Sequence, residues 1–493
     1  MTRVIRARTN AGRLAGRWDG DVAAFRGIPF AEPPVGDLRW RPPGPVTAWD
    51  DERPAYDVGP APLQPQPSRD SIMFHTNFAD RRALVMSEDC LYLNVWTPEP
   101  SGTSGGLPVM VWVHGGGNRY GHGGQEIHDG RALARRGIVV VTLNHRLGAL
   151  GFLAHPGLAA EDERGASGNY GLLDIVAALT WVRENAAHFG GDPGRVTLAG
   201  NSAGAAHLCH LMASAAARPL FHAALGQSAS GVGRAEGPLP DQAAAQAHGL
   251  CWAGEFGDRD ITGLRRISGA ELILAGHFGP VVDGRLLTEP TDDVFGTGRQ
   301  HAVPLLVGSN DDEGSAYATL DVLRRLPAHS GIGALYPVRD ADEACRTARR
   351  FTGESRFTYP VWHWARAHSG RAPTWMYRFT RTPPLPPGLD LAPPRDGLPG
   401  YGAHHTAELP YVLDNLDRRS WHWTAVDREL ARVMADTWAR FATTGDPNGG
   451  ALPTWRRFTA TEAMVFGDTD PARPGHLERP DAMRLLANLP RPL

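Results

Sequence analysis

The chain is patterned by short apolar runs, rich in β-branched and aromatic residues, that are separated by much longer stretches. The clearest runs are 109–113 (VMVWV), 138–143 (IVVVTL), 196–199 (VTLA), 304–308 (PLLVG) and 374–379 (TWMYRF). Runs of this near-continuous kind are typical of strands that are buried on both faces, and helical stretches lie between some of them. The pattern predicts an α/β fold with a large central, mostly parallel sheet that is flanked by helices.

Two segments have the apolar spacing of helices. In the first, which precedes the run at 196–199, apolar residues recur every three or four positions until GGDPG at 190–194 ends the pattern. These residues are Leu172, Ile175, Val176, Leu179, Val182, Ala186 and Phe189. The second helix is expected over 428–443, before TTGDPNGG. A strand, a helix and a strand in this order predict a βαβ unit.

The 493 residues fit one large α/β domain, and we expect residues 1–493 to form a single domain. Residues 241–275 and 320–367 have mixed helical and loop character, and we expect them to form lobes around the site, over the sheet. The segment 383–400 is rich in Pro and Gly and lies just before a histidine-containing stretch. We expect this segment to be an ordered loop at the rim of the site.

The charge balance and the cysteines limit the classes of partner. With 50 basic and 53 acidic residues the net charge is −3, so there is no basic field to bind nucleic acid or an anionic membrane. No apolar run approaches membrane-spanning length, and the first residues lack the apolar core of a secretory signal. Cys90, Cys209, Cys251 and Cys345 show no C-x-x-C metal or redox spacing. These features predict a cytoplasmic protein.

A serine between two glycines in G-x-S-x-G spacing occurs at Ser202 (GNSAG) and again at Ser104 (GTSGG). A nucleophilic serine of this kind lies at a sharp turn between a strand and a helix, where close backbone leaves no room for a Cβ at the glycines. A strand is predicted before Ser202 by RVTLA, and a helix is predicted after it by AGAAHLCHLMASAAA. The residues around Ser104 predict neither a strand nor a helix. We therefore expect Ser202 to be the nucleophile, with a helix N-cap as the alternative role.

An acyl reaction also needs donors that stabilise an oxyanion. The expected strand at 109–113 runs into His114 and the glycines 115–117, followed by Asn118 and Arg119. The backbone N–H groups of such glycines can point into a cavity beside Ser202. On its own the glycine run equally fits a flexible turn, and the pairing with the Ser202 motif favours the oxyanion hole.

The serine further needs a base and an acid. In α/β hydrolases the acid follows the nucleophile in the chain and the histidine comes last. Asp311, Asp312 and Glu313 follow the expected strand at 304–308, and His404 and His405 lie in the later stretch YGAHHTAELPY. Chain order alone leaves the choice within each group open.

Four longer segments match a known family pattern: FRGIPFAEPPVGDLRWRPP (25–43), SEDCLYLNVWTP (87–98), GNYGLLDIVAALTWVRENAAHFGGDPGRVTLAGNSAGA (168–205) and FATTGDPNGGALPTW (441–455). With them the chain resembles the type-B carboxylesterases, the cholinesterase-like branch of the α/β-hydrolase fold, and among these the bacterial para-nitrobenzyl-esterase-like members. The resemblance covers nearly the whole chain. It implies the α/β-hydrolase fold, ester hydrolysis, and a reaction that needs no metal or organic cofactor.

The resemblance also implies roles for single residues. The family's nucleophile falls on Ser202 and its acid, the glutamate of a D-E-G pattern, on Glu313. Its histidine belongs to an H-x-x-E-L pattern, which His405 fits and His404 does not. The implied oxyanion donors are the backbone N–H groups of Gly116, Gly117 and Ala203. The implied structural ion pairs are Arg146 with Asp174 and Arg39 with Glu88.

The chain departs from the family pattern at several positions. Asn201 stands where most members have a glutamate beside the nucleophile, which removes a carboxylate that helps to stabilise the histidinium ion. Asn118 and Arg119 stand where an aromatic residue usually follows the glycines, so we expect a more polar substrate pocket. Arg119 either pairs with a substrate carboxylate or points to solvent. We take all three as candidate substrate-pocket residues.

Two other departures concern single groups. Cys90 has no upstream cysteine to pair with, and we expect a buried free thiol. Asp311 and Asp312 directly precede Glu313. We expect the negative charges of these neighbours to raise the pKa of a carboxyl group here if that group is buried.

Together these features predict a serine carboxylic ester hydrolase that acts through an acyl-enzyme on small to medium ester substrates. The alternatives are the same triad acting on a carbamate, an amide or a lactone, and a binding protein that has kept the fold without catalysis. The presence of Ser202, Glu313 and His405 disfavours the latter. The expected partner is a small-molecule ester, with neither nucleic acid nor a membrane, and the sequence carries no prediction of oligomeric state.

Overall fold

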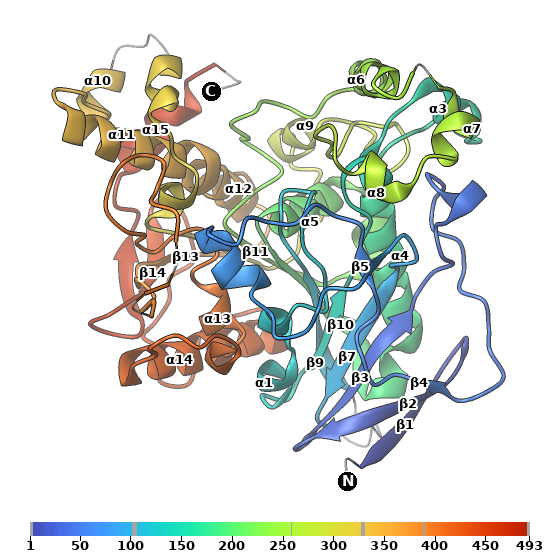
Figure 1. Ribbon diagram of the computed structural model, residues 1–493. Coiled ribbons are helices and arrows are strands. Elements are labelled where there is room, and N and C mark those ends of the chain that lie inside the picture. The colour runs from blue at the N-terminus through green and yellow to red at the C-terminus, as the bar shows by residue number, and fades with distance from the viewer. Residues whose placement is uncertain are drawn as a thin grey trace.

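The computed structural model of the chain describes residues 3–100, 106–257, 259–326, 331–386, 388–389 and 391–490. Ser104, the second serine in G-x-S-x-G spacing, lies outside these residues, as do residues 327–330 of the expected lobe at 320–367. A mixed sheet runs through the middle of the molecule with helices on both faces (Figure 1).

The main sheet has 13 strands, in the order β1-β2-β3-β7-β9-β8-β10-β11-β12-β13-β14-β15, with β4 beside β2, and β5 pairs with β6 separately. The strands are β1 (Val4–Thr9), β2 (Gly12–Asp19), β3 (Val22–Pro29), β4 (Arg53–Pro54), β5 (Ala61–Pro62), β6 (Met86–Ser87), β7 (Tyr92–Thr97), β8 (Leu107–Val113), β9 (Val139–Leu143), β10 (Gly191–Asn201), β11 (Ala223–Gln227), β12 (Leu305–Asn310), β13 (Thr374–Phe379), β14 (Glu462–Phe466) and β15 (Arg473–His476). Pairing is parallel from β9 through β14 and antiparallel at both ends, except that β4 pairs with β2 in parallel.

Each of the expected strands lies in this parallel part, in β8, β9, β10, β12 and β13, so the predicted fold class is confirmed. Alternate residues of β8 enter two different cores: Val109, Val111 and Val113 one, Met110 and Trp112 the other. Both faces are therefore covered, which explains why the sequence of this strand is apolar throughout instead of alternating.

The α-helices surround this sheet (Figure 1). They are α1 (Arg131–Ala134), α2 (Gly148–Phe152), α3 (Pro156–Ala160), α4 (Tyr170–Asn185), α5 (Ala203–Ala213), α6 (Gln242–Gly254), α7 (Ile261–Arg265), α8 (Gly269–Leu272), α9 (Thr291–Gly296), α10 (Ile332–Leu335), α11 (Ala341–Gly353), α12 (Tyr359–Ser369), α13 (Leu409–Val412), α14 (Ala425–Thr444) and α15 (Pro480–Ala487). The core of Val109 includes residues of α4, α5 and α12, and the core of Trp112 includes residues of α1 and α14.

Both expected helices are present, as α4 and α14. The first is shorter than expected, because residues Ala186–Phe189 tighten into a 3-10 turn and Gly190 then adopts φ 77°. In α14 the side chain of Thr424 accepts from the N–H of Asp427, and the Asp427 side chain accepts from the N–H of Thr424. Gly445 ends that helix with φ 71°.

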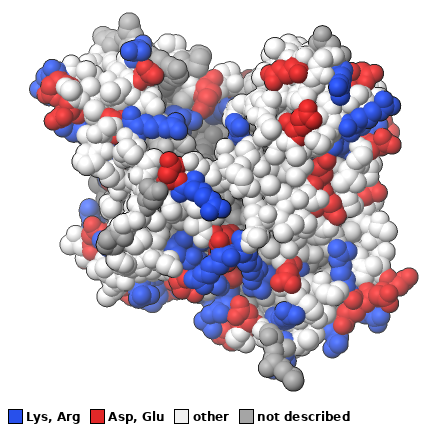
Figure 2. Space-filling view, in the orientation of Figure 1, with Lys and Arg blue, Asp and Glu red and all other residues white. Residues whose placement is uncertain are grey.

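Two groups of helices lie at one end of the sheet. In Figure 1, α6, α7 and α8 lie at the upper right and α10, α11 and α15 at the upper left. Figure 2 shows that the surface is hollowed between these two groups, with arginines and carboxylates interspersed over the face drawn. Among the described residues, no helix is both long and apolar enough to cross a membrane.

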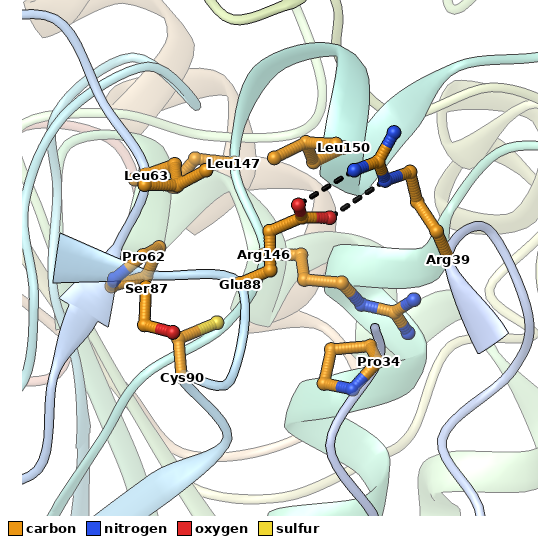
Figure 3. Close-up of a pocket in the computed structure, with 10 residues that line it drawn as sticks. All are labelled: Pro34, Arg39, Pro62, Leu63, Ser87, Glu88, Cys90, Arg146, Leu147 and Leu150. Carbon is orange, nitrogen blue, oxygen red and sulfur yellow. Dashed lines mark hydrogen bonds and ion pairs between the residues drawn. The ribbon is translucent and has the colours of Figure 1, made fainter. Parts of the chain in front are cut away.

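The two ion pairs expected from the family resemblance are present. The guanidinium group of Arg39 donates to both carboxylate oxygens of Glu88, each at 2.6 Å (Figure 3). Arg146 and Asp174 pair at 2.6 Å and are almost fully buried. Cys90 is a buried free thiol beside the first pair, as expected, and burial raises the pKa of this thiol far above its usual range (Figure 3). The first pair joins two loops, and the second joins the loop after β9 to α4.

Candidate active site

Ser202 lies at the turn where β10 ends and α5 begins, which is where its sequence context predicts a nucleophile. Its backbone has φ 54° and ψ −127°, a combination that a residue with a side chain adopts only under constraint. The turn is tight, since a Cβ at Gly204 would lie 2.2 Å from the carbonyl oxygen of Val113 and one at Gly200 2.8 Å from the same atom. The N–H of Ser202 donates to the carbonyl of Gln227 at 2.7 Å, which fixes the turn to the next strand.

Three side chains from separate parts of the chain form a hydrogen-bonded series at this turn. His405 Nε2 lies 2.9 Å from Ser202 Oγ, and His405 Nδ1 lies 2.6 Å from Glu313 Oε2. A carboxylate accepts, so Nδ1 carries the proton and Nε2 is left to accept from the serine hydroxyl. The other oxygen of Glu313 accepts from the backbone N–H of Asn310 at 2.8 Å, which fixes the carboxylate.

The imidazole of His405 is enclosed by two aromatic side chains. The ring of Phe357 lies 4.5 Å from it and the ring of Tyr317 lies 5.3 Å from it, measured between centroids. His405 and Glu313 are each only 1% exposed, so little water competes for their hydrogen bond. Neither aromatic residue was identified from the sequence, because neither belongs to a motif and Phe357 is far from His405 along the chain.

His404, the neighbouring candidate, faces a different part of the molecule. Its Nε2 lies 3.0 Å from Thr76 Oγ1 and its Nδ1 lies 3.2 Å from the carbonyl oxygen of Gly402. Burial lowers the pKa of His404 to about 4, so this ring is neutral near neutral pH. Of the two histidines, the structure thus brings only His405 to Ser202.

The two aspartates before Glu313 are also directed away from Ser202. Asp311 accepts from the guanidinium of Arg378 at 2.7 and 3.0 Å, and Asp312 lies 3.4 Å from Nη1 of Arg349. Burial raises the pKa of both aspartates and the arginines lower it. The pKa values of the two aspartates are thus raised, as expected for buried carboxyl groups, but the main cause is burial, and the like charges that contribute are those of Glu478 and Asp396 instead of the neighbours in the chain.

Substituting Glu313, Asp311 and Asp312 one at a time should therefore show which of the three carboxylates supports the reaction. Glu313→Gln replaces the acceptor for the Nδ1 proton with an amide and favours the wrong imidazole tautomer, so kcat for a simple aryl ester should fall on the order of 10⁴-fold. Asp311→Asn and Asp312→Asn, measured in the same assay, should retain activity within about tenfold, because each only weakens an ion pair. A larger loss for either aspartate variant than for Glu313→Gln would contradict the assignment of the acid.

The glycine loop after β8 lies against the serine turn. A Cβ at Gly115 would lie 2.9 Å from the Cβ of Ser202, so only glycine permits this approach. Gly116 has φ 120° and Gly117 has φ 62°, both in the region that favours glycine. Within the part of the chain that the structure describes, the N–H groups of Gly116, Gly117 and Ala203 donate to no protein acceptor. Three N–H donors beside a serine hydroxyl are suited to bind an oxyanion.

A buried carboxylate near Glu313 and His405, that of Glu408, was not assigned a role from the sequence. Oε1 of Glu408 accepts from the side-chain amides of Asn201 and Gln227, each at 2.9 Å. Oε2 accepts from the amide of Asn310 at 2.6 Å. Three amide N–H donors match an ionised carboxylate, which only accepts. Asn201 thus contacts this carboxylate, where a glutamate at the same position would repel it.

The pKa of Glu408 reflects this setting. Burial raises it, the nearby carboxylate of Glu313 raises it further, and the hydrogen bond from Asn310 lowers it. Glu408 is the glutamate of the H-x-x-E-L pattern and could be located from the sequence, whereas Asn310 and Gln227 belong to no motif. Their only signal is that each is the last residue of a parallel strand, β12 and β11.

A small pocket opens beside the Ser202 hydroxyl. It is lined by Met73, Asn77, Phe78, Gly115, Gly116, Gln125, His128, Asn201, Ser202, Tyr317, His405, Thr406 and Leu409. Asn201 is therefore in the pocket, whereas Asn118 and Arg119 do not line it. Asn118 has φ 61° and a buried Oδ1 that finds no hydrogen-bond partner among the described residues. Arg119 lies with its guanidinium over the ring of Tyr120, 5.8 Å from the centroid.

Metal-ligating side chains do not gather here or elsewhere in the described ranges, since no group of three or more His, Cys, Asp or Glu is placed to hold a metal ion. The chemistry that the site can perform follows from its own side chains: a serine made nucleophilic by a histidine and carboxylate, next to free N–H donors. This is the arrangement used for acyl transfer.

Comparison with known proteins agrees with this arrangement. Residues 3–330 and 335–479 match the family described as the carboxylesterase family. The chain is 40% identical to fumonisin B1 esterase of Sphingopyxis macrogoltabida, over 93% of this chain and 86% of that one. It is 33% identical to para-nitrobenzyl esterase of Bacillus subtilis, over 90% and 91% respectively. A solved PNB esterase structure matches with a TM-score of 0.80 and 30% identity, covering 98% of this chain and 99% of that one.

Proposed function

The chain belongs to the carboxylesterase family, and from this premise we propose that it hydrolyses carboxylic esters with Ser202, His405 and Glu313 as its catalytic triad. The observation that carries the assignment is the continuous series from Ser202 Oγ through His405 to Glu313, at 2.9 and 2.6 Å. The family makes the chain an esterase. The residues that perform the reaction, and the substrate that it takes, are the subject of the proposal.

In the first step His405 Nε2 takes the proton from Ser202 as Oγ attacks the ester carbonyl carbon. The resulting imidazolium ion is stabilised by the ionised Glu313, which accepts from Nδ1–H. Collapse of the tetrahedral intermediate breaks the bond to the leaving alkoxide, which takes the proton from His405. The products of this step are the alcohol and an ester of Ser202, the acyl-enzyme.

In the second step a water molecule gives its proton to His405 and attacks the acyl carbon, which releases the carboxylic acid and returns the proton to Ser202. We propose that the N–H groups of Gly116, Gly117 and Ala203 stabilise the oxyanion in both steps. Loss of one donor of this kind costs about 10²- to 10³-fold in kcat. The lack of another acceptor for these three groups among the described residues supports the proposal.

We also propose that residues 241–275 and 320–367 act as lobes around the site of a single domain. In the first segment lie α6, α7 and α8, and in the second α10, α11 and most of α12. Support comes from Phe357, which belongs to the second segment and packs against His405. A cytoplasmic setting is proposed as well, which the four free cysteines support.

A fluorophosphonate that reacts with activated serines tests the assignment of the nucleophile. We expect one equivalent to bind covalently, with the label on Ser202 when digested peptides are analysed by mass spectrometry. The heat-denatured protein should remain unlabelled, because activation depends on His405 being in place. Labelling at Ser104, or no labelling of the folded protein, would contradict the proposal.

A further inference from the structure

We infer that the preferred substrates are esters that carry a carboxylate group, which Arg119, Arg234 and Arg356 bind at the mouth of the site. This inference rests on the proposed function and specifies the substrate class of the same site.

Arg356 is separated from the triad by one layer of aromatic rings. Its guanidinium lies over the ring of Tyr317 at 5.5 Å and over that of Phe357 at 5.8 Å, and these are the two rings that enclose His405. The same arginine lines a cavity of about 350 Å³ that shares Tyr317 with the pocket at Ser202. The pocket at Ser202 and this cavity therefore meet at Tyr317, with Arg356 on the far side of its ring.

Arg234 lies on the same side and shares one carboxylate with Arg356. That carboxylate, Glu236, is 3.9 Å from Nε of Arg234 and 3.7 Å from Nη2 of Arg356, which is too long for hydrogen bonds. Nη1 of Arg234 is buried and finds no hydrogen-bond partner in the described part of the chain. The other carboxylate that lines the cavity, Asp321, pairs with Arg324 at 3.0 Å.

Arg119 approaches from the oxyanion loop. Its N–H donates to the carbonyl of Gly116 at 3.1 Å, which places it one turn beyond the proposed oxyanion donors. Its Nε is buried without a hydrogen-bond partner, and among the described residues its guanidinium has no ion pair. The segment that contains His277 lies against this loop, because a Cβ at Gly279 would lie 3.0 Å from Nδ2 of Asn118. Partial burial and then the charges of Arg119, Arg234 and Arg356 lower the pKa of His277, while Glu236 raises it.

The charge at this mouth differs from that at the structural ion pairs. The structural arginines are matched closely, as when Arg39 meets Glu88 and Arg146 meets Asp174 at 2.6 Å. Here Arg234 and Arg356 share one carboxylate at long distance, and Arg119 and Arg234 each hold a buried nitrogen atom without a hydrogen-bond partner among the described residues. A buried donor without an acceptor is costly, and a substrate carboxylate supplies the missing acceptors in the planar geometry that guanidinium groups favour.

The test compares monoethyl glutarate, which ends in a free carboxylate, with diethyl glutarate, in which that group is a second ethyl ester, by titrating the acid released at constant pH and taking initial rates per ester bond. In the wild type, kcat/KM should be higher for the anionic monoester. In Arg119→Gln, Arg234→Gln and Arg356→Gln, the ratio of kcat/KM for the anionic to the neutral ester should fall about tenfold or more, the usual effect of losing a hydrogen bond to a charged group. Acetoxyacetate and propyl acetate, compared in the same way, show whether the carboxylate is recognised on the alcohol side instead.

Two control variants make the result decisive. Arg432→Gln removes the same charge from α14, where Arg432 pairs with Glu429, and should leave the ratio unchanged. Glu236→Gln removes the competing carboxylate and should raise the ratio. If all three arginine variants lose activity equally on both members of each pair, the arginines position the site and the inference is overturned. If the wild type hydrolyses none of these esters while labelling of Ser202 also fails, the proposed function itself is wrong.

Discussion

Ser202→Ala should lower kcat for p-nitrophenyl acetate by about 10⁶-fold, to the residual rate that binding and the oxyanion donors support alone. The reason is geometric as well as chemical. The hydroxyl is held at φ 54° by a turn that is fixed to Gln227 and by the close approach of Gly115, so no neighbouring group can replace it. The release of p-nitrophenolate at several enzyme concentrations measures the loss and reveals any trace of wild-type protein.

Ser228→Ala is the matched control for this variant. Ser228 is also buried, also has a positive φ, of 57°, and follows the end of the adjacent strand β11. Its hydroxyl has no hydrogen-bond partner among the described residues, so removing it should change kcat little. If Ser202→Ala keeps activity within twofold of the wild type, the assignment of the nucleophile is lost.

His405→Ala should be nearly as damaging as loss of the serine, again about 10⁶-fold in kcat, because residues of a triad act as a unit. Without the imidazole, the Ser202 hydroxyl has no base and the leaving alkoxide has no acid. The two losses should not add, so the variant that lacks both Ser202 and His405 should be about as inactive as either single variant. Rates measured on the same ester for the three proteins test this.

The control is the adjacent residue, His404→Ala. Its ring contacts Thr76 and Gly402 instead of the serine, so the expected effect is on the stability of the fold, with far less effect on kcat. Thermal unfolding of both variants separates the two effects. A smaller loss of kcat in His405→Ala than in His404→Ala, with both proteins folded, would move the triad by one residue.

The sequence predicted the central part of the fold because burial on both faces leaves a strong apolar signal. The strands β8 and β9 are made almost entirely of apolar residues, and β13 has four large apolar or aromatic residues among its six. By contrast β11, with the sequence AALGQ, has no β-branched residue, and its extended conformation comes from pairing with β10 and β12. Tertiary contacts of this kind override local propensity and cannot be deduced from the segment itself.

The site was predictable only where it has local motifs. Ser202 has a strand and a helix around it, and the glycine loop follows a strand, so both could be recognised from the residues. The choice of His405 over His404 required the family pattern, because the geometry that separates them is the contact of His404 with Thr76, which is 328 positions away. Phe357, Gln227 and Arg234 were not recognised, since only the packed fold brings them to the site.

The amide cluster around Glu408 has a consequence for how this enzyme can evolve. One carboxylate joins the ends of β10, β11 and β12 to the histidine loop through Asn201, Gln227 and Asn310. The family pattern has glutamates at both positions, so a glutamate at Asn201 would place a second carboxyl group against Glu408 where water is excluded, and one of the two is then expected to hold a proton. Asn201 removes this requirement, because its neutral amide donates a hydrogen bond to Glu408 without needing a proton from solvent. Evolution can therefore exchange these two residues by changing the charge at the base of the site, without a matching substitution at Glu408.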